Sequence, residues 1–361
     1  SVSGLWTLTL GPAAPDIYPY CFVVDGVSVM DPQNSQYFPN EGFKKSLLDI
    51  PGKDNPLIHA YQSQNPQGKV DYVTYYSSTI GCYNNALIYT PASYNPADNK
   101  RYPVFYLISG TTDTEEVYYK VGRMNTIIDN LIAEGKAEEM IIVLPYGNPV
   151  KLMDQPADFA MDLFSNDLIN DLMPYVEANY LTINDAEHRA IGGFSRGGNQ
   201  ALSNGLMNLD KFSYLCSYSS FTSTQLPYVY DHAKETNSKI NLFWLGIGTD
   251  DLLYKTSHDY IEFLRKKGIN HMLEFTKGKF GHTWMNAKYF LAQTMPLLFN
   301  KEKATAAMSD GGMPLPELKG DEEDFNPLVM SRLFPPQVTS PEFGQGNVTF
   351  RIKAENAQEV L

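Results

Sequence analysis

Short apolar runs alternate with helical patterns over residues 70–300, and this alternation constrains the fold more than any other feature of the chain. The apolar runs have no polar face, which is typical of strands that are buried on both sides of a sheet. Between them, apolar residues recur at the spacing of one helix face. The clearest strands are YPVFYLIS at 102–109, EMIIVLP at 139–145, RAIGGF at 189–194 and INLFWLGIG at 240–248. Strands that alternate with helices predict an α/β fold with a largely parallel sheet.

The two ends of the chain differ from this central region. Residues 1–32 follow a β pattern in GLWTLTLG and IYPYCFVVDG, and residues 334–361 return to it in GNVTFRIKAENAQEV. Residues 33–69 are rich in Pro, Asn, Gln and Gly without a period, so we expect an irregular connector there. Residues 301–333 combine Pro, Gly and acidic residues, and we expect them to form a linker. The sequence therefore predicts one α/β domain at 70–300 between two β-rich ends.

The charge balance limits the classes of partner. The chain has 41 Asp and Glu against 28 Lys and Arg, a net charge of -13. This argues against nucleic acid, whose phosphates need a basic patch, and against an anionic membrane surface. No run of about 18 apolar residues is present, so no membrane-spanning segment is predicted, and we expect no signal peptide within the sequence as given. Cys21, Cys82 and Cys216 lie far apart and predict neither a zinc site nor a disulfide framework.

The stretch IGGFSRGGNQ contains the pattern Gly193-x-Ser195-x-Gly197. It follows a predicted strand and precedes a predicted helix. A nucleophile elbow needs this context, because its turn is so tight that glycine is required on both sides and the serine Oγ is lifted clear of the sheet. The start of the following helix adds amide donors for a developing oxyanion. A phosphate-binding or packing loop is the alternative, but the strand–turn–helix context favours Ser195 as a nucleophile.

A serine nucleophile needs a base, and with an elbow of this kind the acid and then the histidine follow the serine along the chain. Of the six histidines, His258, His271 and His282 follow a candidate acid. His258 is expected to start a helix, and His271 is expected to open a strand. His282 lies in KGKFGHTW, a glycine-flanked loop after the last strand, from which an imidazole can reach back to Ser195. These positions favour His282 as the base, the alternative being a satisfied surface or core histidine.

The acid and the oxyanion donors are less sharply defined. TDDLLY follows the strand INLFWLGIG, so Asp250 and Asp251 are both candidates for the carboxylate that holds the imidazole, and spacing leaves the choice open. The other aspartate can cap the next helix. Two amide groups are expected to form the oxyanion hole, one from Arg196 and one from Thr111 in LISGTTDTEE. The Arg196 side chain either contacts substrate or is solvated.

Several longer stretches extend this pattern, namely YPVFYLISG, GRMNTIIDNLIAEGKAEEMIIVLP, DLMPYVEANY, RAIGGFSRGGNQAL and GIGTDDLLY with the later GHTW. Together they resemble carbohydrate esterase family one, in particular the feruloyl esterases and acetyl xylan esterases of plant-fibre-degrading bacteria. The resemblance implies an α/β-hydrolase fold, with a mostly parallel sheet flanked by helices, and a Ser–His–Asp triad. The family aspartate matches the fourth residue of G-x-x-D, so the resemblance assigns the acid to Asp251.

The chain departs from the family at several positions. Ser109 stands before Gly110 where the family usually has His-Gly, and Tyr118 stands where a Trp is common. Phe280 replaces the first Gly of G-G-H-T-W, and MNAK follows Trp284. These departures concern the acyl pocket rather than the triad. By resemblance, Trp284 and Tyr118 are expected to line the aromatic ring of the acyl group, the alternative for Trp284 being core packing.

The ends resemble the two halves of the immunoglobulin-like β-sandwich that precedes the catalytic domain in these esterases. The first half of that module is similar to SPEFGQGNVTFRIKAENAQEV, and its second half is similar to GLWTLTLGPAAPDIYPYCFVVDG. Here the first half lies at 334–361 and the second at 1–32. Neither piece alone buries a sheet face or satisfies its edge strands. We therefore expect the ends to complete one sandwich, within one chain or by strand complementation with a neighbouring chain. The alternatives are a piece cut from a tandem array or two disordered fragments.

The resemblance implies a serine esterase that needs no metal or organic cofactor and releases ferulate from feruloylated xylan oligosaccharides. Acetylated xylan is the alternative substrate for the same residues. A siderophore trilactone esterase also combines a β-sandwich with this fold, but its metal-loaded substrate is anionic and the acidic balance of the chain disfavours it. A carbohydrate-binding protein with a silent hydrolase domain is the alternative from another class. The polymer substrate of the family implies a secreted or periplasmic protein.

Overall fold

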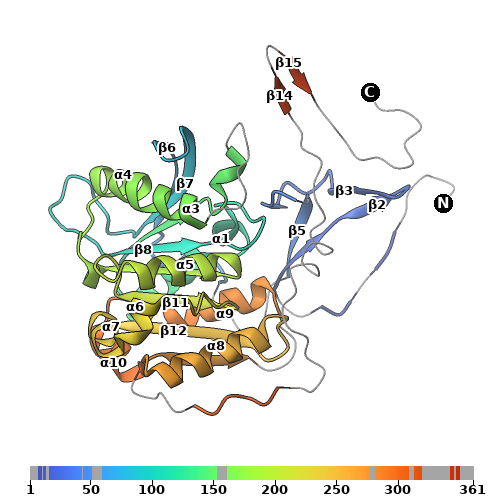
Figure 1. The fold of residues 1–361 in the computed structure, drawn as a ribbon. Coiled ribbons are helices and arrows are strands. Elements are labelled where there is room, and N and C mark those ends of the chain that lie inside the picture. The colour runs from blue at the N-terminus through green and yellow to red at the C-terminus, as the bar shows by residue number, and fades with distance from the viewer. Residues whose placement is uncertain are drawn as a thin grey trace.

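The computed structural model describes residues 7–9, 11–13, 16–42, 44–50, 59–152, 161–276, 281–308, 313–318, 342–344 and 347–349. Within these residues, an 8-stranded sheet lies between two layers of helices (Figure 1). The sheet order is β13–β12–β11–β10–β8–β9–β7–β6. The strands are β6 (Lys69–Ser77), β7 (Cys82–Thr90), β8 (Val104–Ile108), β9 (Ile141–Pro145), β10 (Arg189–Phe194), β11 (Tyr214–Tyr218), β12 (Leu242–Gly248) and β13 (Met272–Thr276).

The direction of the strands confirms the predicted α/β fold. All neighbouring strands from β13 to β9 pair in parallel. At one edge, β7 pairs antiparallel with β9, and β6 pairs antiparallel with β7. The register places Gly193 of β10 beside Ile108 of β8 on one side and beside Ser217 of β11 on the other. These three strands therefore end together, and the loops that follow them meet at one edge of the sheet.

Two clusters of buried apolar residues fill the space between the sheet and the helices. Val104, Tyr106 and Ile108 of β8 belong to one cluster, and Phe105 and Leu107 belong to the other. This alternation is that of a strand covered on both faces. The helical elements are α1 (Val117–Lys120), α2 (Met124–Ala133), η1 (Pro149–Leu152), α3 (Met161–Asp167), the π-helical η2 (Leu168–Leu172), α4 (Met173–Asn179), η3 (Ala186–His188), α5 (Arg196–Met207), α6 (Pro227–Asp231), α7 (Ala233–Lys239), α8 (Tyr254–Lys267), α9 (Trp284–Thr294) and α10 (Lys301–Met308).

Helix α8 ends at a glycine. Gly268 follows its last turn with a φ of 71°, a left-handed conformation that glycine adopts without a Cβ penalty. Its amide N–H donates to the carbonyl oxygens of Arg265 and Leu264, which satisfies acceptors that the helix end leaves open. The chain then enters β13, and His282 follows that strand along the chain.

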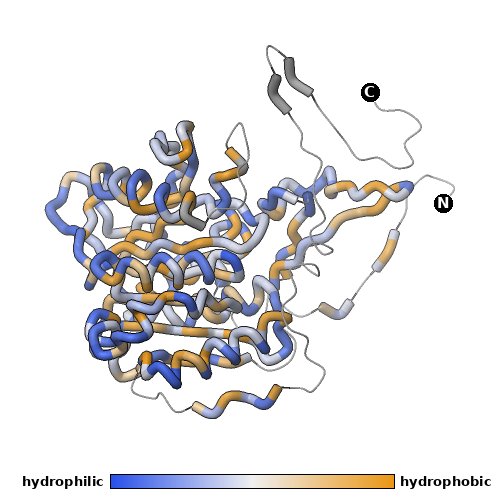
Figure 2. The backbone as a smooth tube through the Cα atoms, viewed as in Figure 1, coloured by the Kyte–Doolittle hydropathy of each residue, from blue (hydrophilic) through white to orange (hydrophobic). Residues whose placement is uncertain are grey.

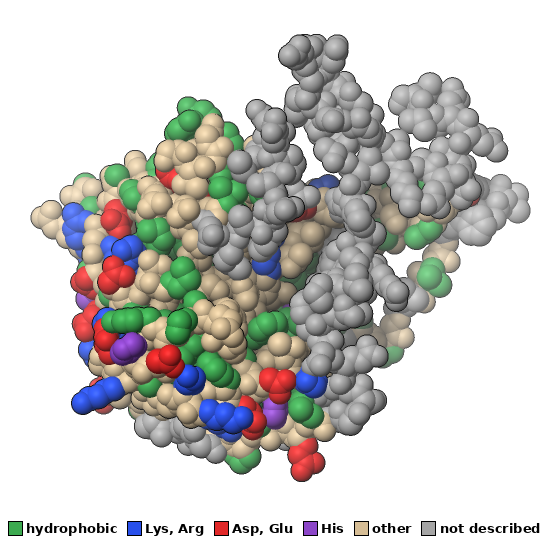
Figure 3. Space-filling model, viewed as in Figure 1, with side chains coloured by type: hydrophobic (Ala, Val, Ile, Leu, Met, Phe, Trp, Pro, Cys, Tyr) green, Lys and Arg blue, Asp and Glu red, His purple; other side chains and the backbone are tan. Residues whose placement is uncertain are grey.

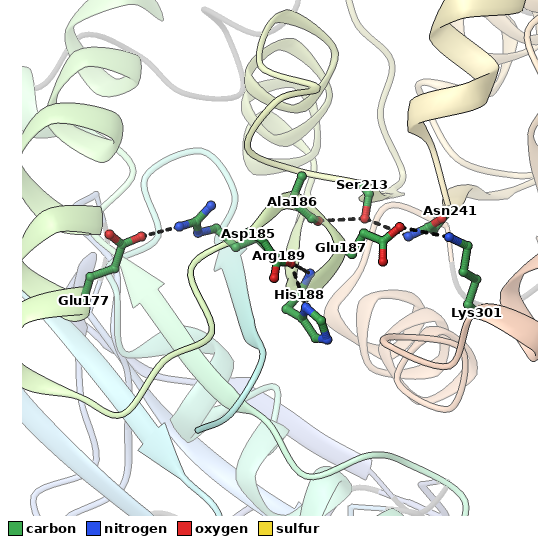
Figure 4. A network of polar contacts seen from close by, with 9 residues as sticks. All are labelled: Glu177, Asp185, Ala186, Glu187, His188, Arg189, Ser213, Asn241 and Lys301. Atoms are coloured by element: carbon green, nitrogen blue, oxygen red, sulfur yellow. Dashed lines mark hydrogen bonds and ion pairs between the residues drawn. The ribbon is translucent and has the colours of Figure 1, made fainter. Parts of the chain in front are cut away.

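Polar contacts tie the amino ends of the central strands (Figure 4). Arg189, the first residue of β10, pairs with Glu177 of α4 at 2.6 Å. The Ser213 hydroxyl donates to the carbonyl oxygen of Ala186 at 2.7 Å, and the Asn241 amide donates to the Ser213 hydroxyl at 3.1 Å. These contacts fix the starts of β10, β11 and β12 at the edge opposite the one that carries Ser195.

The expectation of an irregular connector at 33–69 is wrong for two segments. Strands β4 (Tyr37–Phe38) and β5 (Lys45–Ile50) pair antiparallel to form a small sheet with β1 (Asp16–Tyr20). This sheet packs on the α/β domain, because Ile17, Phe38 and Leu47 form one buried cluster with Val117 and Val121. The segments carry too few apolar positions to show a period, so their sequence gave no sign of a strand.

The hairpin of β2 (Phe22–Val24) and β3 (Val27–Val29) stands away from the α/β domain (Figure 1). Its strands carry mostly apolar residues (Figure 2), and these are exposed, from 40% at Val29 to 68% at Val23. Of the strand expected at 4–11, the described residues 7–9 and 11 form no strand. At the other end, β14 (Glu342–Gly344) and β15 (Asn347–Thr349) pair with each other. The expected completion of one sandwich by residues 1–32 and 334–361 depends largely on residues outside the described ones.

The expected linker at 301–333 begins with a helix, so that interpretation is wrong for residues 301–308. Ala304 of α10 is buried, and the Met308 sulfur accepts a hydrogen bond from the Phe243 amide at 3.0 Å. KEKATAAM consists largely of good helix formers, a signal that the acidic and Pro/Gly-rich residues after it obscured. Further along, the Tyr254 hydroxyl donates to the carbonyl oxygen of Pro316 at 2.6 Å. The α/β domain therefore extends past residue 300.

Acidic and basic side chains are interspersed on the face drawn in Figure 3. Among the described residues, no helix combines the length and apolar character that crossing a membrane requires.

Candidate active site

Ser195 occupies a strained turn between β10 and α5. Its φ of 57° and ψ of -122° are unfavourable for a residue with a Cβ, and such strain persists only where the surroundings impose it. Glycines on both sides allow the close approach. A Cβ on Gly193 would lie 2.4 Å from the Gly197 carbonyl carbon, and a Cβ on Gly197 would lie 2.2 Å from the Ile108 oxygen. The residues predicted to form an elbow thus form one at the carboxyl edge of the sheet.

His282 lies between Ser195 and Asp251. Its Nε2 is 2.8 Å from the Ser195 Oγ, and its Nδ1 is 3.0 Å and 3.1 Å from the two Asp251 carboxylate oxygens. The Asp251 side chain is fully buried, whereas Asp250 is exposed. The Leu253 amide also donates to Asp251 Oδ1 at 2.8 Å and so fixes the carboxylate. In this geometry a protonated Nδ1 donates to Asp251 and leaves Nε2 to accept the Ser195 proton.

Phe194 and Asn286 contact His282 and its neighbour Gly281, and the sequence pattern gave no indication of either role. The Phe194 ring stacks on the His282 ring, with centroids 4.9 Å apart. Asn286 is buried, and its amide donates to the carbonyl oxygen of Gly281 at 3.0 Å while its oxygen accepts from the Thr276 hydroxyl at 2.8 Å. Asn286 therefore ties the residue before His282 to the end of β13.

The residues expected to supply the oxyanion donors flank Ser195. The Arg196 amide opens α5, at the positive end of the helix dipole. Thr111 lies in the loop after β8, and that loop runs past the nucleophile because a Cβ on Gly110 would lie 3.6 Å from the Ser195 Cβ. The Arg196 amide therefore directly follows Ser195, and the loop that carries Thr111 lies beside the serine.

Asn40 and Glu41, which lie in the connector expected at 33–69, hold the loop after β8. The Glu41 amide donates to the carbonyl oxygen of Thr112 at 2.7 Å. The Asn40 side-chain amide donates to the Thr112 hydroxyl at 3.1 Å and to Asp113 Oδ1 at 3.0 Å. Both Asn40 and Asp113 are buried. Residues from the small N-terminal sheet thus reach the edge of the candidate site.

Burial raises the pKa of Asp113 from 3.8 to about 7, although the Asn40 amide and the Arg196 guanidinium favour the charged form. The folded chain then retains a proton that the unfolded chain releases, so the free energy of unfolding falls as pH rises from about 4 to about 7. We expect the variant Asp113→Asn to lack this contribution. Relative to the wild type, its free energy of unfolding should increase between pH 4 and pH 7, as measured by urea unfolding at both values. The variant Asp250→Asn, at an exposed site, is the control; a difference that does not change with pH would contradict the assignment.

The two expected substrate-contacting aromatics differ in exposure. Tyr118 is only 1% exposed and packs edge-on against Trp284, with ring centroids 4.8 Å apart. The expectation that Tyr118 lines the acyl group is therefore wrong for this structure, because its ring has no surface left for a ligand. Trp284 is partly buried and also contacts the Phe194 ring at 5.2 Å. Of the two, Trp284 alone retains surface beside His282.

The Arg196 side chain folds against the neighbouring loop after β9. A Cβ on Gly147 would lie 3.0 Å from its Nη2. Burial lowers the pKa of Arg196, and the nearby Glu41 carboxylate opposes that change. Glu41 accepts hydrogen bonds from the Tyr146 hydroxyl at 2.7 Å and from the Asn148 amide at 3.2 Å. The alternative of a solvated Arg196 side chain is thereby replaced by a partly buried one within a polar cluster.

Comparison with known proteins places this geometry among ester hydrolases. The model of the family described as "Putative esterase" matches residues 77–277, a range that contains Ser195 and Asp251 and ends before His282. Over 218 residues, the chain is 33% identical to an endo-1,4-beta-xylanase/feruloyl esterase of Xylanibacter ruminicola. That alignment covers 59% of this chain but only 30% of the relative, so the chain spans about a third of the length of that relative.

Solved structures share the fold. A ferulic acid esterase of Anaeromyces mucronatus in complex with ferulic acid superposes with a TM-score of 0.57 at 24% identity, covering 68% of this chain and 96% of that one. The feruloyl esterase module of Clostridium thermocellum, solved as a mutant with sinapinate, gives a TM-score of 0.55 at 20% identity, covering 74% and 95%. Both likenesses support the α/β-hydrolase fold that the resemblance implied.

Proposed function

Because the chain belongs to the esterase family whose model spans residues 77–277, we propose that it is a serine esterase in which Ser195, His282 and Asp251 form the catalytic triad. The observation that carries the proposal is the continuous hydrogen-bonded series from Ser195 Oγ through the imidazole to the Asp251 carboxylate. Membership of this family makes the chain a carboxylic ester hydrolase, as the sequence resemblance implied.

The proposed reaction has two acyl-transfer steps. His282 Nε2 takes the proton of Ser195 Oγ as the oxygen attacks the ester carbonyl carbon, and Asp251 stabilises the imidazolium. The amide groups of Arg196 and Thr111 donate to the oxyanion. When the tetrahedral intermediate collapses, the leaving alcohol takes the proton from His282. Water then loses a proton to His282 as it attacks the acyl-enzyme. When the second tetrahedral intermediate collapses, the acid leaves and His282 returns that proton to Ser195 Oγ, which regenerates the hydroxyl.

We propose that the acyl group is ferulate or a related hydroxycinnamate, carried on plant cell-wall xylan. Three observations support this choice. The curated relative is named for xylanase and feruloyl esterase activities, and the structural neighbours were solved with ferulic acid and with sinapinate. Trp284 offers a partly exposed aromatic ring beside His282. A polymeric substrate outside the cell would require the enzyme to be secreted or periplasmic.

The acyl class is tested by the variant Trp284→Ala on two esters. We expect its kcat/KM for methyl ferulate to fall about 10-fold more than its kcat/KM for 4-nitrophenyl acetate, because only the aromatic acyl group loses a ring contact. Steady-state kinetics of the wild type and the variant on both esters measure the ratio. Equal losses on both esters would assign Trp284 to core packing. A wild type that hydrolyses acetylated xylan and leaves methyl ferulate intact would replace the hydroxycinnamate proposal with acetyl xylan esterase activity.

A further inference from the structure

The segment 39–41 pairs with the loop after β8 as a short antiparallel ladder. The Glu41 amide donates to the carbonyl oxygen of Thr112 at 2.7 Å, and the Thr114 amide donates to the carbonyl oxygen of Pro39 at 3.4 Å. Between these bonds, Asn40 and Asp113 form an antiparallel bridge. The segment lies before residue 77, outside the range that the family model matches. The ladder therefore joins the segment 39–41 to the loop that carries Thr111.

The side chain of Asn40 forms three hydrogen bonds at this junction. It is 2% exposed, and its amide donates to both Thr112 Oγ1 and Asp113 Oδ1. Its oxygen accepts from the Gly42 amide at 2.7 Å, which sets the orientation of the group. A buried side chain with three well-placed partners holds both segments rigidly.

The loop needs such a holder because its backbone is strained. Thr112 has a φ of 61°, a left-handed conformation that is an outlier for a β-branched residue and is energetically unfavourable. Relaxation of Thr112 would rotate the Thr111–Thr112 peptide and displace Thr111, and that displacement would change where the Thr111 amide points. An oxyanion donor is effective only when it points at the place where charge develops, so small rotations lower the rate.

From this geometry we infer that Asn40 is a positioning residue of the oxyanion hole, which acts through Thr112 and Asp113 on the Thr111 amide. The inference rests on the proposed esterase function and deepens it. Glu41 adds a second attachment, because its carboxylate accepts from Tyr146 in the loop after β9. The residues that the active site needs then include the segment 39–41, which precedes β6, the first strand of the central sheet along the chain.

The test compares the variants Asn40→Ala and Asn34→Ala with the wild type on 4-nitrophenyl acetate, an ester that does not depend on the natural acyl group. Asn34 is a matched control, because its side-chain amide donates to Leu47 and Tyr20 within the same small sheet. Asn40→Ala should lower kcat about 10- to 100-fold and change KM less than about 3-fold. Asn34→Ala should retain the wild-type kcat. A normal kcat in Asn40→Ala, or the same loss in both variants, would overturn the inference.

Amide hydrogen exchange followed by mass spectrometry gives a second readout that needs no activity. Asn40→Ala should accelerate exchange in peptides that cover residues 110–114, whereas Asn34→Ala should leave those peptides unchanged. Unchanged exchange at 110–114 in Asn40→Ala would overturn the inference even if kcat had fallen. A folded wild type that hydrolyses no ester would refute the proposed function, while the exchange comparison would still decide whether Asn40 holds the loop.

Discussion

The variant Ser195→Ala is expected to lower kcat for ester hydrolysis by about 10⁴- to 10⁶-fold while the protein remains folded. Alanine keeps the Cβ of the elbow but removes the hydroxyl oxygen that lies 2.8 Å from His282 Nε2 and attacks the carbonyl in the proposed reaction. Without it no acyl-enzyme forms, and the remaining groups can at most stabilise the attack of water. Steady-state assays with 4-nitrophenyl acetate and methyl ferulate measure the loss, and circular dichroism checks the fold.

Ser219 provides a matched control for this variant. It is a buried serine with a φ of 53° immediately after β11, the strand next to β10. The variant Ser219→Ala makes the same chemical change at a residue with a similar φ, and it should keep kcat within about 3-fold of the wild type. Equal losses in Ser195→Ala and Ser219→Ala would show that activity depends on the local fold rather than on one nucleophile.

The variant Asp251→Asn is expected to lower kcat by about 10⁴-fold, and Asp250→Asn is expected to keep it within about 3-fold. An asparagine amide at 251 would donate to His282 Nδ1 and force the proton onto Nε2, the tautomer that cannot accept the Ser195 proton. Asp250 is exposed, so its charge is solvated.

The kinetic comparison of these adjacent aspartates uses 4-nitrophenyl acetate at a pH where the wild type is fully active. Both substitutions remove one negative charge from neighbouring positions, so any general electrostatic effect is common to the pair. The reverse order, with Asp250→Asn the slower variant, would contradict the assignment of Asp251 as the partner of His282.

The parts of the site that lie in short local patterns were predictable from the sequence. The G-x-S-x-G motif between a buried strand and a helix is sufficient to place Ser195, since the glycines serve a steric need that the structure makes explicit at Gly193 and Gly197. Asp250 and Asp251 differ only in the direction of their side chains. That direction depends on the turn after β12, which spacing does not encode, so the residues alone left the choice open.

The parts that depend on distant contacts were not predictable. Asn40 bonds Thr112 across 72 residues, and nothing in a non-periodic segment marks such a contact. The two short strands in the expected connector are defined by their pairing, because β4 pairs with β5 and β5 pairs with β1. The resemblance placed Tyr118 against substrate, but its burial against Trp284 follows from packing between α1 and α9, which a family motif does not specify. The roles of side chains that depend on tertiary packing therefore cannot be predicted from one sequence.

We propose above all that a triad led by Ser195 releases a hydroxycinnamate from a plant cell-wall glycan. The most direct measurement is ferulate release from a feruloylated arabinoxylan oligosaccharide by the wild type beside Ser195→Ala, quantified by liquid chromatography. We predict release by the wild type and none above background by the variant. Release by both proteins would contradict the role of Ser195, and no release by a folded wild type would contradict the feruloyl ester as substrate.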